Sequence, residues 1–90
     1  MPDRIITAAT AQTLQEQAHD ERGVLIWIVM EGDGDHPEKF AARPVQSGTG
    51  ALHCVLVADT LDELRAQLPA GLARSERQPA DASGVVEIWY

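Results

Sequence analysis

The sequence predicts an α+β domain in which two helices pack against one mostly antiparallel, four-stranded sheet, in the order α-β-β-β-α-β. Three observations indicate this class. The 90 residues are 44% hydrophobic and 23% charged, as in folded globular proteins rather than disordered chains. Short runs rich in β-branched residues, bounded by glycines, indicate strands, and two stretches with capping residues indicate helices. A chain of this length has one core, so residues 1–90 are expected to form a single domain.

The first predicted element is a helix over residues 8–22. Thr7 can cap its N-terminus through the side-chain hydroxyl, and Gly23 can adopt the left-handed conformation that commonly ends a helix. A narrow apolar face rich in alanine suits close packing on a sheet. This face consists of Ala11, Leu14 and Ala18.

Four segments are predicted to be strands, and the first of them is short, apolar and rich in β-branched residues. They are residues 24–30, 39–46, 52–58 and 85–90. The glycines, proline and acids of residues 31–38 predict an exposed loop after the first strand. Pro44 has no N–H to donate to a neighbouring strand, so we expect its strand to lie at a sheet edge or to carry a bulge. The first three strands should form an antiparallel meander, and a crossover through the second helix should return the fourth strand to the same sheet.

The second helix is predicted from a capping box, in which Thr60 caps the N-terminus and Glu63 follows three residues later. Leucines at positions 61, 64 and 68 lie on one face of this helix, and Pro69 ends it. Residues 69–84 then form a long, irregular connection that is extended over part of residues 72–77. Long connections of this kind often contribute to a site or an interface.

The first and third predicted strands are apolar on both faces. Side chains alternate along a strand, and in residues 24–30 both alternating sets are apolar; the same holds in residues 52–58 except for His53. A sheet covered on one face only shows polar residues at every second position. Two arrangements would bury both faces: the helices lie on opposite faces, or both lie on one face and a second copy of the protein covers the other. The first helix has few large apolar residues, which favours the homodimer.

The net charge of −7 argues against nucleic-acid binding. Most of the excess negative charge lies in residues 1–38, and such a chain would repel the phosphate backbone of a nucleic acid. The longest apolar run, residues 24–30, is far shorter than a transmembrane helix. Cys54 is the single cysteine, so no internal disulfide can form. We therefore expect an acidic, cytoplasmic protein that binds neither nucleic acid nor membranes.

No residue is predicted to be catalytic, to bind a cofactor or to hold a metal. His53 and Cys54 are adjacent in a strand and so point to opposite faces, and Cys54 shares its face with leucines, which predicts a buried apolar role for it. The acidic loop from Asp33 to Glu38 lacks the twelfth-position glutamate of an EF-hand and is expected to be a solvated turn. These residues favour a non-enzymatic role.

A small set of basic residues offers an alternative, a shallow site for an anion or another small molecule. Arg43 stands in a strand otherwise made of small residues, and His53 lies among valines. Arg65, Arg74 and Arg77 could join Arg43 if the connection at 69–84 folds back over the sheet. Scattered surface arginines with weak salt bridges are the simpler interpretation.

Several stretches resemble a group of small bacterial proteins of unknown function and similar length. They are residues 40–44 (FAARP), 57–65 (VADTLDELR), 68–72 (LPAGL) and 86–89 (VEIW). This resemblance implies a bacterial, cytoplasmic protein and no particular activity. The order of three strands, a helix that begins after Asp59 and Thr60, and a last strand is also distantly similar to HicB-type antitoxin domains, at the level of the fold.

The leading hypothesis is a non-enzymatic protein-interaction or regulatory domain that forms a homodimer or binds another protein. The alternative is a small-molecule or anion-binding protein, enzymes included, that uses Arg43 and His53. A ligand-dependent gain in thermal stability that requires Arg43 would separate the two.

Overall fold

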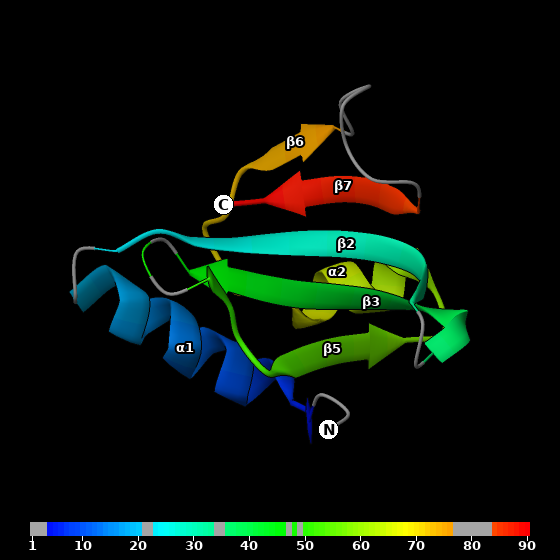
Figure 1. Cartoon of the computed structure of the whole chain (residues 1–90), viewed down its shortest axis with the longest axis horizontal. Helices are drawn as coiled ribbons and strands as arrows, with labels where there is room; N and C mark the ends of the chain where they lie inside the picture. The colour runs from blue at the N-terminus through cyan, green and yellow to red at the C-terminus, as the bar shows by residue number, and fades with distance from the viewer. Residues whose placement is uncertain (1–3, 21–22, 34–35, 47, 49, 77–83) are drawn as a thin grey trace.

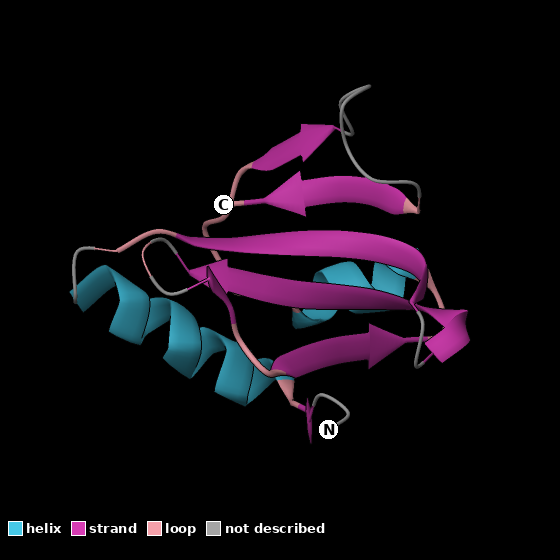
Figure 2. Ribbon diagram, viewed as in Figure 1, coloured by secondary structure: helices cyan, strands magenta, loops and turns pink. Residues whose placement is uncertain are grey.

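One mixed β-sheet carries both described helices on a single face (Figure 1, Figure 2). The computed structural model describes residues 4–20, 23–33, 36–46, 48, 50–76 and 84–90. Its helices are α1 (Ala8–Asp20) and α2 (Leu61–Gln67). Its strands are β1 (Arg4–Ile5), β2 (Leu25–Asp33), β3 (His36–Gln46), β4 (Gly50–Ala51), β5 (Cys54–Ala58), β6 (Arg74–Glu76) and β7 (Val85–Trp89). The strands follow the order β1-β5-β3-β2-β7-β6, and β4 pairs with β3.

The α+β class and all six predicted elements are confirmed, but the four-stranded sheet is wrong. The sheet also contains β1, β4 and β6, each only two or three residues long. Strands this short have no hydrophobic periodicity of their own, and they form by pairing with a longer neighbour. β1 runs parallel to β5, which makes the sheet mixed. β6 confirms the predicted extension within residues 72–77, of which residue 77 lies outside the described residues.

The last strand takes a place inside the sheet. The antiparallel meander of β2, β3 and β5 is confirmed. After α2 the chain passes this meander and returns as β7, which pairs antiparallel with β2 on the side away from β3. β5 and β7 are therefore separated by β3 and β2. This order brings residues 85–89 against the first long strand.

Residues 31–33 and 36–38 continue the sheet, so the loop predicted over residues 31–38 is wrong for these positions; residues 34 and 35 lie outside the described residues. β2 extends to Asp33 and β3 begins at His36, so the two strands make a long hairpin. Gly32 adopts a positive φ of 75°, and the pairing shifts register between Glu31 and Asp33. A bulge at a glycine lets a strand continue where another residue would be strained. Gly32, one of the residues on which the loop prediction rested, is thus part of an irregular strand.

Pro44 lies inside the sheet and not at its edge, and the pairing of β3 on one side shifts register beside it, as the bulge alternative predicts. It is fully buried and pairs with Trp27 on β2. On the other side of β3, pairing with β5 covers residues 40–42 and pairing with β4 covers residues 45–46. Pro44 falls between these two stretches, and its carbonyl accepts a hydrogen bond from Leu52 N (3.1 Å). The N–H and C=O of one strand residue point to the same side, here away from β2, so proline removes no hydrogen bond from the ladder between β3 and β2.

The hydrophobic core lies between the sheet and the two helices. Trp27 on β2 is fully buried, and its indole Nε1 donates to Gln15 Oε1 of α1 (3.0 Å). Leu64 of α2 is equally buried and belongs to the same cluster. α1 and α2 also contact each other, and α2 lies behind β2 and β3 in Figure 1. The arrangement with the helices on opposite faces is therefore wrong.

Candidate interaction surface

The sheet face opposite the helices is apolar. Ile26 pairs with Val45, and Met30 pairs with Ala41, across β2 and β3, and cross-strand neighbours lie on the same face. β5 and β7 continue this face on either side. Figure 1 looks onto it. We call this surface the open face, and define it by Ile26, Ile28, Met30, Ala41, Val45, Val57 and Ile88.

The open face keeps contact with water, whereas the helix-covered face does not. Ala41 is buried, but the other six residues of the open face are partly exposed. On the opposite side of β2, Leu25, Trp27 and Val29 have at most 1% exposure. The prediction that both faces of this strand are apolar is confirmed, and the described helices cover only one of them.

Arg43 stands within the open face. It pairs with Ile28 in the register of β2 and β3, so it leaves β3 on the apolar side, where it is half-buried. His53, the second residue expected at an anion site, is exposed in the bend before β5. The His53 carbonyl accepts a hydrogen bond from Arg4 N (3.3 Å), which joins β1 to the sheet.

Arg74 lies on the other face of the sheet. It pairs with Trp89 on β7, and its Nη1 lies 3.8 Å from Glu87 Oε2. The sheet therefore separates Arg74 from Arg43, and the structure does not bring the two into one pocket. Arg77 lies outside the described residues. An anion site that combines Arg43 with Arg74 is not formed.

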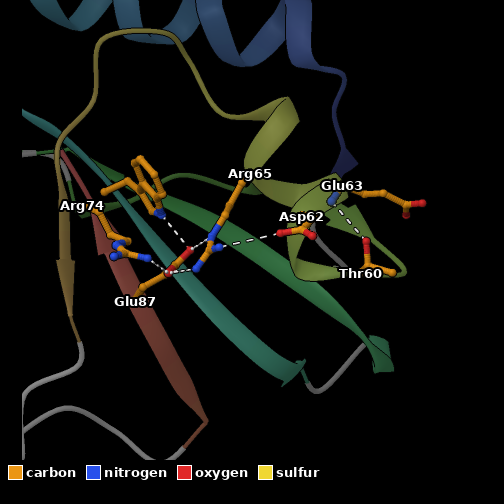
Figure 3. A network of polar contacts seen from close by, with 7 residues as sticks. Thr60, Asp62, Glu63, Arg65, Arg74 and Glu87 are labelled. Carbon is orange, nitrogen blue, oxygen red and sulfur yellow. Dashed lines mark hydrogen bonds and ion pairs between the residues drawn. The ribbon is translucent and has the colours of Figure 1, made fainter.

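Glu87 is the centre of a buried polar cluster on the helix side (Figure 3). It is 3% exposed and accepts two hydrogen bonds from Arg65 of α2, Nε to Oε1 at 2.8 Å and Nη2 to Oε2 at 2.7 Å. Trp89 Nε1 donates a third, to Oε1, at 2.9 Å. Hydrogen bonding from Arg65, more than any other contact, holds the pKa of Glu87 below its ordinary value. Both carboxylate oxygens are engaged, so the cluster ties α2 to β7 rather than offering a reactive acid or base.

Sequence reasoning misses this cluster, although the strand at 85–89 contains a sign of it. Glu87 is the single charged residue in that apolar strand and shares a face with Val85 and Trp89. A carboxylate that faces a core needs a cationic partner. The partner, Arg65, lies 22 residues earlier in the chain, and no local spacing rule connects the two.

A hollow of about 350 Å³ lies between α1 and the chain that follows α2. Its walls are residues 15, 16, 19 and 20 of α1, residues 70–72, and Tyr90. Among the described residues that line it, Glu16 and Asp20 are acidic and none is arginine or lysine, so these charges disfavour an anion. Arg43, His53 and Arg74 all lie elsewhere.

Cys54 has the buried apolar role that its position in the strand predicts. Its side chain is 6% exposed and belongs to the core cluster. Burial raises the pKa of the thiol, which lowers the fraction of thiolate at neutral pH. A nucleophilic role for Cys54 is therefore disfavoured.

The described part of the chain contains no group of three or more His, Cys, Asp or Glu side chains placed to hold a metal ion. Neither α1 nor α2 has the length and apolar character needed to cross a membrane.

Comparison with known proteins identifies no relative. The chain matches no family model, no curated protein and no solved structure. The resemblances to small bacterial proteins and to HicB-type antitoxin domains stay predictions, and the function has to be argued from the surface of the molecule.

Proposed function

We propose that this chain is a bacterial, cytoplasmic protein-interaction or regulatory domain without enzymatic activity, and that it binds its partner through the open face. The observation that carries the proposal is the second apolar face of the sheet, which lies away from both described helices. Monomeric soluble proteins rarely expose a large contiguous apolar surface, and those that do commonly use it for binding.

Covering this face contributes favourable free energy to a complex. Complete burial of one exposed aliphatic side chain contributes about 1.5–3 kcal/mol. The six partly exposed residues of the open face have already lost part of their contact with water. At roughly a third of the full value each, they contribute about 3–6 kcal/mol together. Polar contacts at the rim add to this before the entropic cost of association is subtracted.

The polar groups on the helix side support a binding role over a catalytic one. The Glu87 carboxylate is held by Arg65 and Trp89, and the Cys54 thiol is buried. A general base or a nucleophile needs access to its substrate. Neither of these groups has it.

Site-specific photocrosslinking in cells that produce the protein tests the proposal. A photoreactive phenylalanine analogue replaces Ile28 or Val57 on the open face, and replaces Gln17, exposed on α1, in the control. We expect covalent protein adducts from the two open-face positions and only background from position 17. If folded protein gives no adduct at either open-face position, the proposal is wrong.

An anion-binding protein is the second candidate, and the position of Arg43 within the open face favours it. A guanidinium can hold a phosphate or a carboxylate through paired hydrogen bonds. In that case phosphate raises the melting temperature of the wild type but not that of Arg43→Ala. Under the interaction proposal, phosphate and a chloride control of equal ionic strength have the same effect on both proteins.

A further inference from the structure

We propose that a second copy of this chain covers the open face, so that two sheets pack face to face in a homodimer. The inference rests on the proposed function, because it names the partner of the same surface. In this arrangement both helical layers lie outside, and the apolar side chains of the two sheets interdigitate between them.

The open face is large enough for a weak, reversible dimer. The twofold arrangement described below superposes four neighbouring strands, β3-β2-β7-β6, and a spacing of about 4.8 Å gives them a width of roughly 19 Å. About six residues along each of the longer strands give a length of roughly 20 Å. Two such faces bury roughly 800 Å² in total, the size of a weak, transient interface. We therefore expect a dissociation constant in the high micromolar rather than the nanomolar range.

Electrostatic forces do not oppose a contact through this face. Each copy has a net charge of −7, but the residues that define the open face include no carboxylate, and the charged side chain within it is that of Arg43. The contact thus places no two carboxylates against each other, and repulsion between the copies acts over longer distances. Salt screens such repulsion beyond about 8 Å at physiological ionic strength. Salt should therefore strengthen this dimer, whereas it weakens one held by salt bridges.

The strand register gives the two copies a self-complementary row of side chains. Taken across β3, β2, β7 and β6, the row is Arg43, Ile28, Ile88 and Ser75. A twofold axis between β2 and β7 places Ile28 against Ile88 of the partner subunit. It also places Arg43 against the short side chain of Ser75 of the partner subunit. The two Arg43 side chains are then three strand spacings apart, about 14 Å along the sheet, so they do not repel each other at close range.

Sedimentation velocity of the purified full chain, from low micromolar to several hundred micromolar, tests the inference. Ile28→Lys places a charge at the centre of the open face. Ile28→Thr keeps a β-branched side chain and its strand preference but removes apolar contact. Ala66→Lys, exposed on α2 on the other side of the sheet, is the matched control for an added positive charge. Circular dichroism and thermal melting establish that each variant is folded.

We expect the wild type and Ala66→Lys to pass together from monomer to dimer as the concentration rises, and higher salt to favour the dimer. Both Ile28 variants should require at least about tenfold more protein for the same dimer fraction. If Ile28→Lys fails to fold, Ile28→Thr decides. A wild type that stays monomeric throughout overturns the inference. A dimer that the folded Ile28 variants retain unchanged also overturns it, because the contact then lies on another surface.

Photocrosslinking at position 28 separates the failure of this inference from the failure of the proposed function. Adducts with twice the mass of the chain support both. Adducts with a different protein, combined with a monomeric purified chain, retain the interaction function and overturn the second copy as the partner. No adducts, combined with a monomer, overturn both.

Discussion

Arg65 and Glu87 form a two-point ion pair that fastens α2 to β7, although 22 residues separate them along the chain. The Glu87 side chain is buried, whereas the Arg65 side chain is 32% exposed. Trp89 and Arg74 contact the same carboxylate. The helix and the strand are therefore held by charge as well as by apolar packing, and the next two predictions follow from this pair.

Replacement of Glu87 by alanine should lower the free energy of unfolding by about 2 kcal/mol, since hydrogen bonds to a charged group contribute about 1.5–3 kcal/mol and Trp89 loses its partner too. Urea unfolding followed by circular dichroism measures the change. Asp62→Asn is the control, because Asp62 is 96% exposed and lies 3.8 Å from the same arginine. It should leave stability almost unchanged. Equal effects of the two substitutions would contradict the structural role of Glu87.

The same carboxylate should make stability sensitive to acid. The Arg65 hydrogen bonds hold the pKa of folded Glu87 below its ordinary value, which the unfolded chain is expected to have. A carboxyl group of this kind stabilises the fold above its unfolded pKa, and the contribution is lost as the pH falls through the folded pKa. The free energy of unfolding should thus decrease below about pH 4.5, and less steeply in Glu87→Gln. Parallel curves for the two proteins between pH 7 and pH 3 would show that Glu87 does not take part.

Thr60 should contribute measurably to the start of α2. Its hydroxyl oxygen accepts a hydrogen bond from Glu63 N at 3.1 Å, and loss of such a cap costs about 1 kcal/mol. Thr60→Ala should therefore lower the urea midpoint, and Thr60→Ser should restore most of it because serine caps equally well. A serine variant as unstable as the alanine variant would mean that the methyl group, and not the cap, matters.

Cys54 should react slowly with a thiol reagent while the protein is folded. Its side chain is buried, and burial raises the pKa of its thiol, so both access and thiolate concentration are low. Labelling with Ellman's reagent at neutral pH measures the rate, and the same protein in guanidinium chloride is the reference. Rapid, complete labelling of the folded protein would contradict the buried position.

The long elements could be predicted because they depend on neighbours in the sequence. The Thr60 cap located the start of α2, and the β-branched run at 24–30 located β2. Alternation along the same run predicted two apolar faces, from which the open face follows. The same alternation in residues 52–58 places Cys54 on one face with leucines, which predicted that it is buried.

The rest could not be predicted, because it depends on pairing between distant segments. Pro44 is tolerated inside the sheet because its backbone carbonyl points away from β2, toward the irregular stretch between β4 and β5. Arg74 faces away from Arg43 because of the register between β6 and β7, and a three-residue strand contains no pattern that reveals its face. The side of the sheet on which the helices pack depends in turn on contacts such as that of Trp27 with Gln15.

The two tryptophans lie at different points of the helical layer, and each gives one helix its own optical reporter. The indole of Trp27 donates a hydrogen bond to Gln15 of α1. The indole of Trp89 donates a hydrogen bond to the carboxylate of Glu87, which also binds Arg65 of α2. Fluorescence from a protein that keeps only one of them follows the detachment of a single helix. Thermal unfolding of the two single-tryptophan proteins thus distinguishes a structure in which α1 and α2 detach at the same temperature from one in which they detach at different temperatures.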